Sequence, residues 1–226
     1  MQEYFKRQIA LWGIDKQKLL QDKSILIVGA GGLGSSVAYA LGATGIGTIH
    51  IVDFDEVSIH NIHRQIAFEL TDEHQNKAKI NAQRIQNRSH FTQVHHHPCD
   101  FEQWTTRNIA VDLIIDATDN LQTRAQIDTF AQQHTTPWIY GSVEAFVGHV
   151  CFFQNSSFKD IFSLSHTQPA GIAAPMVMHI ASLQANLALR YLVDLSVKKD
   201  LLYYLFFNND GELITQKFTL PKKDEI

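Results

Sequence analysis

The chain has 226 residues, of which 45% are hydrophobic and 19% charged, enough for one large core and short for two independent ones. Its formal net charge of -4 offers no general attraction to nucleic acid or to an anionic membrane, so we expect small molecules or proteins as partners. The two cysteines, Cys99 and Cys151, stand far apart and outside any C-x-x-C spacing, so the sequence indicates neither a disulfide framework nor a structural zinc site.

The first segment, residues 1–22, is predicted to be a helical arm. Its opening stretch "MQEYFKRQIALWG" mixes charges and aromatics, whereas a secretory signal needs an unbroken apolar run. Together with the low cysteine content, this predicts a cytoplasmic protein.

Strands and helices alternate through residues 23–142, the predicted nucleotide-binding core. Apolar runs predict strands at 24–30, 47–55, 91–97, 111–117 and 136–142, and helical patterns lie at 31–45, 76–89 and 120–134. Such alternation predicts an α/β fold, a Rossmann-like doubly wound and mainly parallel sheet with helices on both faces.

The pattern changes in residues 143–226, where antiparallel strands and one long helix are predicted. A strand is expected at 144–154, a helix at 171–193, and a hairpin at 201–220 that turns at Asn209-Asp210-Gly211. The long helix contains His179, Gln184 and Arg190, residues costly in lipid, so it is predicted to pack in the core. No linker or repeat interrupts the chain, and we expect a single domain over 1–226.

A phosphate-binding motif follows the first predicted strand. "GAGGLG" (29–34) fits G-x-G-x-x-G and opens a helix through Gly29, Gly31, Gly32 and Gly34. Glycines there let the backbone approach phosphate oxygens, and the helix amino end supplies N–H donors; the alternative is a structural glycine turn. Asp53 lies nineteen residues past Gly34, where an acid binds a ribose hydroxyl. An adenine nucleotide is the expected ligand.

The stretch "DFDEVSIHNIHRQ" (53–65) indicates which nucleotide chemistry applies. Hydride transfer needs only the first acid, whereas Asn61, Arg64 and Gln65 suit a triphosphate, which calls for a guanidinium, a lysine and a divalent cation. Arg64 and Lys77 supply the two organic cations. Asp55 either supports the metal and phosphate side or caps the next segment.

A metal-binding acid is predicted in "DATDN" (116–120), at the carboxyl end of a strand. Ligands bind at this edge of open α/β sheets, which places Asp119 and Asn120 near the nucleotide. Asp119 is also a candidate N-cap of the following helix, and the two roles are compatible.

Five elements occur in one order along the chain: "YFKRQIALWG", "GAGGLG", "DFDEVSIHNIHRQ", Lys77 and "DATDN". With them the sequence resembles the ThiF/MoeB/HesA family of ubiquitin-activating-enzyme-like adenylyltransferases, over nearly the whole chain to about residue 195. The resemblance implies ATP- and Mg²⁺-dependent adenylation of the C-terminal carboxylate of a small ubiquitin-fold sulfur carrier that ends in Gly-Gly, ThiS-like or MoaD-like.

The resemblance also implies roles for single residues. Gly32 and Asp53 would hold the nucleotide, and Asp119 would bind Mg²⁺. Asn61, Arg64 and Lys77 would address the phosphates. Arg7 would reach into the site of a neighbouring subunit, which implies a homodimer. We expect exposed apolar side chains of the same arm to favour that contact: Tyr4, Phe5, Ile9, Leu11 and Trp12.

Three departures from that family are visible. Serines in "DIFSLSH" (160–166) replace zinc-binding cysteines found in many members, so no zinc is expected. The segment "SHTQPAGIAAP" (165–175) lacks a cysteine for covalent thiol chemistry. His60 stands where a serine is usual before the asparagine, and it either alters a phosphate contact or caps the turn.

Other readings stay open at this level. A nicotinamide-dependent oxidoreductase leaves Arg64, Lys77 and Asp119 unexplained, and a catalytically silent scaffold subunit would be expected to have lost them. His95 and His97 share one face of a predicted strand, as a possible metal pair or as an exposed strand face. Three acceptors stay open: a thiamine-pathway carrier, a molybdopterin-pathway carrier or a peptide.

Overall fold

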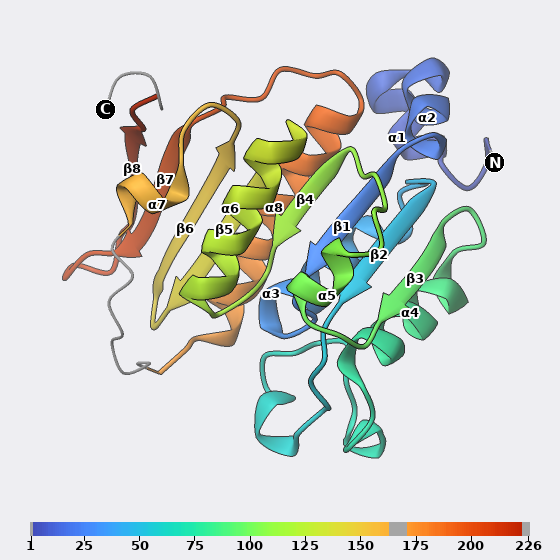
Figure 1. Ribbon diagram of the computed structural model, residues 1–226, viewed down its shortest axis with the longest axis horizontal. Helices are drawn as coiled ribbons and strands as arrows, with labels where there is room; N and C mark the ends of the chain where they lie inside the picture. The colour runs from blue at the N-terminus through green and yellow to red at the C-terminus, as the bar shows by residue number, and fades with distance from the viewer. Residues whose placement is uncertain (1, 163–170, 223–226) are drawn as a thin grey trace.

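The fold is built on one eight-stranded sheet with the strand order β3-β2-β1-β4-β5-β6-β7-β8 (Figure 1). It is seen in a computed structural model that describes residues 2–162 and 171–222. The strands are β1 (Ser24–Val28), β2 (Thr48–Val52), β3 (Gln93–His97), β4 (Leu113–Asp116), β5 (Trp138–Glu144), β6 (Val147–Phe153), β7 (Leu201–Phe207) and β8 (Leu213–Thr219). Strands β1 to β5 pair in parallel, and β5 to β8 pair antiparallel. The predicted α/β class with an antiparallel extension is confirmed.

Helices cover both faces of this sheet. They are α1 (Lys6–Trp12), α2 (Ile14–Gln21), α3 (Gly32–Leu41), α4 (Lys77–Arg88), α5 (Phe101–Thr105), α6 (Leu121–His134), α7 (Phe158–Ile161) and α8 (Ala174–Leu192), with 3-10 turns η1 (Ile59–Asn61) and η2 (Leu70–Asp72). One core cluster joins α3, α4 and α8 to one face of the sheet, and a second joins α5, α6 and α7 to the other. Along β1, Ile25 and Ile27 belong to the first cluster and Leu26 and Val28 to the second.

This doubly wound arrangement defines where a ligand can bind. The chain leaves β1 toward α3 on one face and leaves β4 toward α6 on the other face. Between these neighbouring strands the direction of winding reverses, and a crevice outside their carboxyl ends is the usual ligand site of open α/β sheets. Residues 53–76 extend beyond the same edge, at the bottom of Figure 1.

Several boundaries differ from the sequence prediction. The helix expected at 31–45 ends at Leu41, where Thr44 Oγ1 donates to the Leu41 carbonyl and Gly45 takes a φ of +92°. The short helices α5 and α7 were not predicted. The hairpin turn is confirmed, because the N–H of Gly211, at a φ of +80°, donates to the carbonyl of Asn208.

Among the described residues, no helix is both long and apolar enough to cross a membrane. The long helix α8 packs in the core instead, with Met176, Ile180 and Ala188 buried against the sheet.

Candidate functional site

The β1–α3 turn needs its glycines for steric reasons. Gly29 has a φ of +94°, and a Cβ placed on it would lie 2.7 Å from the carbonyl oxygen of Ala117. A Cβ on Gly34 would lie 1.9 Å from the carbonyl oxygen of Gly29. Only glycine at these two positions permits the tight β1–α3 turn and its close approach to Ala117, which follows β4. The N-cap of α3 is Gly31, which has no side chain to take up the first N–H donors of that helix.

Asp53 joins the end of β2 to this turn. Its Oδ2 accepts the Ala30 N–H at 2.6 Å, and its Oδ1 accepts the Asp55 N–H at 2.8 Å. Burial raises the pKa of this carboxyl, although both hydrogen bonds oppose the shift. A carboxylate offers about four lone-pair positions, so two are left for ribose hydroxyls.

Lys77 and Asp55 form an ion pair beside that acid. Lys77 Nζ lies 2.8 Å from Asp55 Oδ2, and the Lys77 N–H donates to the Asp55 carbonyl. The α4 N-cap, Asn76, fixes the same turn by donating to the carbonyls of Asp53 and Asp55. The structure therefore gives Asp55 the role of a counterion to Lys77, a partner that the sequence did not single out.

The "NIHRQ" segment lies against the glycine turn. A Cβ on Gly32 would lie 3.6 Å from the Arg64 carbonyl oxygen, and one on Gly31 would lie 3.4 Å from Gln65 Nε2. The Arg64 guanidinium donates to Asn61 Oδ1 at 3.2 Å. Gln65 is buried, and its Oε1 has no partner among the described residues. The predicted phosphate residues are thus neighbours in space.

The β4–α6 loop corrects one of the two expectations for Asp119. The N-cap of α6 is Asn120, whose Oδ1 accepts the N–H groups of Gln122 and Thr123. Asp119 is exposed and does not cap the helix. Its carboxylate is therefore free for a ligand, while the carbonyl oxygen of the Asn120 side chain is already engaged.

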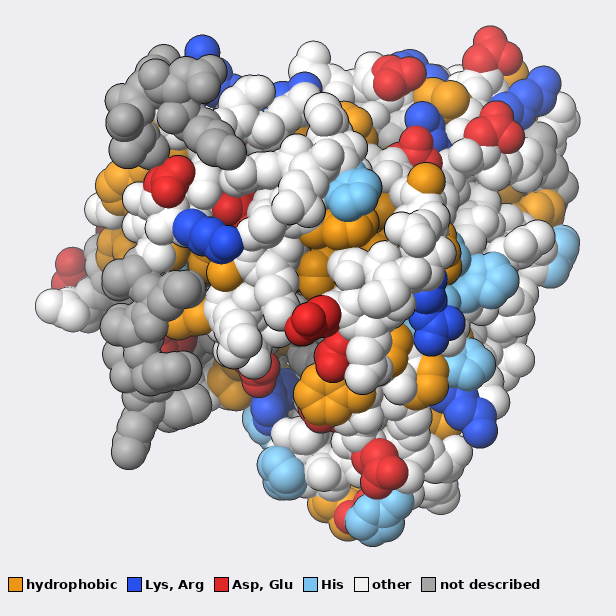
Figure 2. Space-filling view, in the orientation of Figure 1, with side chains coloured by type: hydrophobic (Ala, Val, Ile, Leu, Met, Phe, Trp, Pro, Cys, Tyr) orange, Lys and Arg blue, Asp and Glu red, His pale blue; other side chains and the backbone are white. Residues whose placement is uncertain are grey.

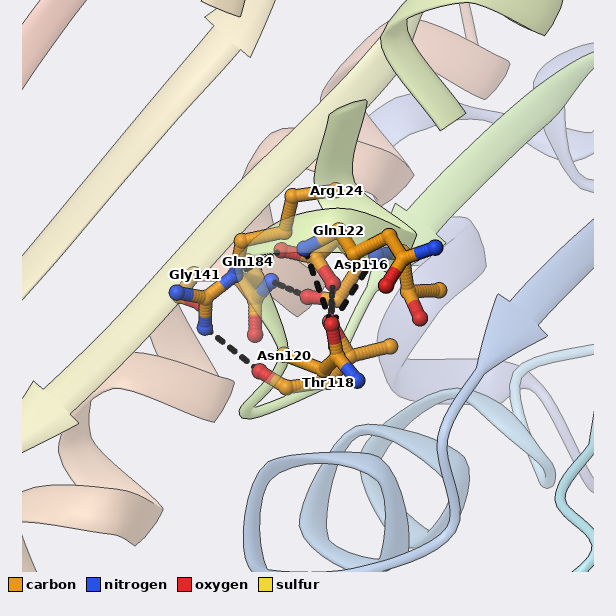
Figure 3. Close-up of polar contacts among 8 residues, drawn as sticks. Asp116, Thr118, Asn120, Gln122, Arg124, Gly141 and Gln184 are labelled. Atoms are coloured by element: carbon orange, nitrogen blue, oxygen red, sulfur yellow. Dashed lines mark hydrogen bonds and ion pairs between the residues drawn. The ribbon is translucent and has the colours of Figure 1, made fainter. Parts of the chain in front are cut away.

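A buried network that the sequence analysis missed holds this loop (Figure 3). Asp116 is fully buried and accepts from Arg124 Nε at 3.1 Å, while Thr118 donates to it through its N–H and its hydroxyl. Gln184 Nε2 donates to the Asp116 carbonyl at 2.7 Å. Burial raises the pKa of Asp116, and the neighbouring Arg124 opposes this shift. The first aspartate of "DATDN" is thus structural, and the second is available to a ligand.

The model of the ThiF family matches residues 5–225. The chain belongs to the ThiF family. It is 31% identical over 97% of its length to an adenylyltransferase and sulfurtransferase of Caenorhabditis briggsae, MOCS3, and covers 58% of that protein. It is 28% identical to the molybdopterin-synthase adenylyltransferase of Haemophilus influenzae over 98% of the chain and 96% of that relative.

The likeness extends to solved structures of low sequence identity. Escherichia coli MccB, solved with ATP, superposes with a TM-score of 0.83 at 17% identity, over 96% of this chain and 71% of that one. This likeness supports the fold. The chain spans 58% and 44% of the two MOCS3 relatives from Caenorhabditis briggsae and Dictyostelium discoideum, or about half of their length.

Arg7, which the family resemblance assigns to a neighbouring subunit's site, lies far from the site of its own chain. It is exposed on α1, and Gln8 of that helix donates to the carbonyl of Thr44, just before β2 begins. In Figure 1, α1 lies where β1 and β2 start, whereas α3, which follows the glycine turn, begins where β1 ends. A five-residue strand spans about 16 Å, so Arg7 cannot complete its own chain's site.

The apolar side chains of this arm are not all exposed. Phe5 is 2% exposed, because its ring packs against Phe91 and a Cβ on Gly45 would meet it at 2.8 Å. The expectation that Phe5 lies on an exposed apolar surface is therefore wrong, since it anchors the arm to its own chain. Leu11 and Tyr4 remain exposed.

Histidines gather on the face shown in Figure 2, over β3 and residues 53–76. His50 Nδ1 lies 3.0 Å from His97 Nε2, and the ring of His95 stacks on His50. The pair predicted from sequence was His95 with His97, but the hydrogen-bonded pair joins β2 to β3. Within residues 2–162 and 171–222, no group of three or more His, Cys, Asp or Glu side chains could hold a metal ion.

The remaining departures are placed only in part. His60 is exposed in η1, next to Asn61. The other two departures fall partly outside the described residues. The structure does not describe residues 163–166 of the segment that lacks zinc-binding cysteines, or residues 165–170 of the segment that lacks a cysteine for thiol chemistry. The absence of zinc therefore stays a prediction.

Proposed function

We propose that this protein adenylates the C-terminal carboxylate of a small ubiquitin-fold sulfur carrier that ends in Gly-Gly, using ATP and releasing pyrophosphate. One observation carries the proposal. A glycine turn, an arginine and a buried lysine meet at one edge of the sheet, in a chain whose family includes named adenylyltransferases.

The nucleotide is proposed to lie across the carboxyl ends of β1, β2 and β4. Asp53 keeps two lone-pair positions for ribose hydroxyls. The turn formed by Gly29, Gly31, Gly32 and Gly34 and the amino end of α3 accommodate phosphate oxygens. Asn61, Arg64, Gln65 and Lys77 serve the triphosphate from the side of residues 53–77.

Asp119 and Asn120 border the same site from β4. Mg²⁺ is usually held by one or two carboxylates together with substrate phosphates rather than by a protein cage. An exposed Asp119 beside a phosphate turn fits that requirement, because Gly29 packs against Ala117, two residues before it. When bound, the metal would supply neutralisation of charge on the phosphates. Asn120 would contribute by holding the start of α6.

The reaction needs no general base. A C-terminal carboxylate has a pKa of about 3.5 and is already a nucleophile at neutral pH. One of its oxygens forms a bond to the α-phosphorus, the bond from that phosphorus to the bridging oxygen of pyrophosphate breaks, and the two electrons leave with pyrophosphate. The chain's contribution is to place the reactants in line and to stabilise charge, for which Arg64 and Lys77 are suited.

Arg7 is proposed to complete the site of a second copy of the chain, as a catalytic residue across a two-fold axis. Its exposure on α1 and its distance from its own nucleotide site support this. Each working site would then need two chains, and the functional unit would be a homodimer.

The test is ATP–pyrophosphate exchange with a panel of Gly-Gly-ended carriers of the ThiS and MoaD types. Exchange that requires a carrier and Mg²⁺ is expected. A carrier lacking its last glycine is the matched control and should give none. Reduction of NAD by a substrate, with no exchange, would favour the oxidoreductase reading, and nucleotide binding without exchange would favour the silent scaffold.

A further inference from the structure

One face of α8 contacts both loops of the nucleotide site. A Cβ on Gly32, in the glycine turn, would lie 2.9 Å from Val177 Cγ1. Seven residues further along the same helix, Gln184 donates to the Asp116 carbonyl at the end of β4. Residues seven apart lie on one face of an α-helix. A single helix therefore supports the phosphate turn and the loop that carries Asp119.

Gln184 enters a gap between β4 and β5. The pairing of these strands stops at Ile115 and Ile139, so the Asp116 carbonyl lies beyond the ladder and takes its hydrogen bond from the Gln184 side chain. Gly141 makes the room, because a Cβ on it would lie 2.4 Å from the amide carbon and nitrogen of Gln184. Arg124 approaches the same gap from the other face and donates to the Gly141 carbonyl at 3.3 Å (Figure 3).

The contact extends through two short links to Asp119. Asp116 Oδ1 accepts the Thr118 N–H at 2.9 Å and its hydroxyl at 2.7 Å. Arg124 donates to the Thr118 carbonyl, the group that precedes Asp119. The peptide that presents the Asp119 carboxylate is therefore fixed by Asp116, whose own carbonyl is held by Gln184.

Packing alone does not account for an amide at this position. Gln184 is fully buried, and its Oε1 has no partner among the described residues. A buried acceptor left unpaired costs about 1–3 kcal/mol, a cost that a methionine of similar shape would avoid. The Nε2 bond to Asp116 is the contact that methionine would lose.

We propose that Gln184 is a positioning residue, which holds the end of β4 so that Asp119 meets the metal-bound triphosphate. The inference rests on the proposed function for the role of Asp119, and it assigns Gln184 no contact with substrate. Its expected signature is specific: loss of Gln184 weakens the part of nucleotide binding that depends on Mg²⁺ and spares the metal-free part, which uses the glycine turn and Asp53.

The experiment measures binding of the non-hydrolysable analogue AMP-CPP by calorimetry, with and without Mg²⁺. We compare Gln184→Met with Leu187→Ala, a control that removes half-buried apolar packing from the same helix. Gln184→Met should lose roughly tenfold of the affinity gained on adding Mg²⁺, in line with residues that orient metal ligands, and Leu187→Ala should keep that gain. An equal Mg²⁺ response in wild type and Gln184→Met would overturn the proposal.

Two further measurements keep the proposal testable if Gln184→Met fails to fold. Gly141→Ala pushes against the Gln184 amide from β5 without changing residue 184, and the same loss of Mg²⁺ response is expected. In the wild type, the side-chain amide signal of Gln184 should shift in NMR spectra when Mg²⁺ joins the AMP-CPP complex, and an unmoved signal contradicts the proposal.

Binding is read without turnover, so the two levels of inference fail separately. If the protein binds Mg²⁺ and AMP-CPP but gives no exchange with any carrier, the proposed function is wrong. A normal Mg²⁺ response in Gln184→Met, beside carrier-dependent exchange in the wild type, removes only the positioning role.

Discussion

Lys77 and Asp55 pair at 2.8 Å, but the lysine side chain is 7% exposed and the carboxylate side chain 52%. The two partners therefore depend on the pair to different degrees. Water solvates the Asp55 carboxylate if the lysine is removed, whereas the buried ammonium of Lys77 has little water to replace a lost carboxylate. The ammonium that Asp55 pairs with is the one proposed to serve the phosphate oxygens.

Removing either partner should consequently give unequal losses of stability. Asp55→Ala is expected to lower the free energy of unfolding by about 1–3 kcal/mol, because a buried charged donor loses its acceptor. Lys77→Met should cost less. Urea unfolding with and without AMP-CPP checks this. The nucleotide should stabilise both variants by binding to the folded state, and its phosphates should raise the stability of Asp55→Ala more than that of Lys77→Met. Equal losses in the two variants, with equal gains from the nucleotide, would contradict the asymmetry.

Asp119→Ala should separate chemistry from stability. The side chain is exposed and does not cap α6, so the free energy of unfolding should change by less than about 0.5 kcal/mol. Carrier-dependent exchange should fall by roughly a hundred- to a thousandfold, as when one stabiliser of developing charge is removed. Asp210→Ala, an exposed aspartate in the β7–β8 turn, is the control and should keep both. Exchange at the parent rate would remove Asp119 from the mechanism.

The sequence predicted positions best for residues whose neighbours are close along the chain or set by strand order, while their roles toward a nucleotide stay predictions. The glycine turn and Asp53 follow from motif spacing, and the parallel βα units follow from alternating patterns. Arg64 and Gln65 were expected to serve the same triphosphate as the glycine turn, because they are grouped directly after the second predicted strand. The structure places both residues next to that turn. In each case local chemistry and topology agree.

Contacts between distant residues were not predictable in the same way. Gln184 and Asp116 stand 68 positions apart, and their bond depends on where β4 and β5 separate, which no local pattern encodes. Asn120 rather than Asp119 caps α6. Both residue types cap helices well, so backbone geometry decides between them, and the sequence does not show it. Phe5 was misplaced because its pocket is formed by Gly45 and Phe91, both distant in sequence.

The histidine pair should make stability depend on pH. Burial lowers the pKa of His50 and of His97 to about 4 each, and His50 is further lowered by His95. The unfolded chain takes up protons near pH 6.5, so the stability contribution of neutral histidines is complete above that pH and is lost as the pH falls toward 4. Arg107 adds positive charge near His97, which lowers the pKa of that histidine further and acts in the same direction as burial.

We expect the free energy of unfolding to fall by on the order of 2 kcal/mol between pH 7 and pH 4.5. Urea unfolding across this range measures it. His97→Gln should flatten the dependence, because an amide can bond to His50 without titrating. The exposed His134→Gln on α6 is the control and should leave the dependence in place. An unchanged slope in His97→Gln would show that other groups cause the loss.

Arg7 provides the sharpest test of assembly. If it serves the partner's site, Arg7→Ala damages the site of the partner chain, whereas Asp119→Ala damages the site of its own chain. Arg7→Ala leaves every residue of its own nucleotide site in place, so it should bind AMP-CPP normally and lose exchange. Asp119→Ala damages its own site and keeps a normal arm. In a mixed dimer, the site of the Arg7→Ala chain receives an intact Arg7 from its partner and should work.

Mixing the two inactive variants should therefore restore exchange, up to about one working site per heterodimer. Mixing Arg7→Ala with Arg7→Lys, or Asp119→Ala with Asp119→Asn, is the control, since no site in those mixtures regains both groups. Light scattering on each mixture confirms that dimers have formed. No recovery of exchange in any mixture would show that each site is built from one chain. A stable monomer with full exchange activity would likewise leave Arg7 as a surface residue of α1.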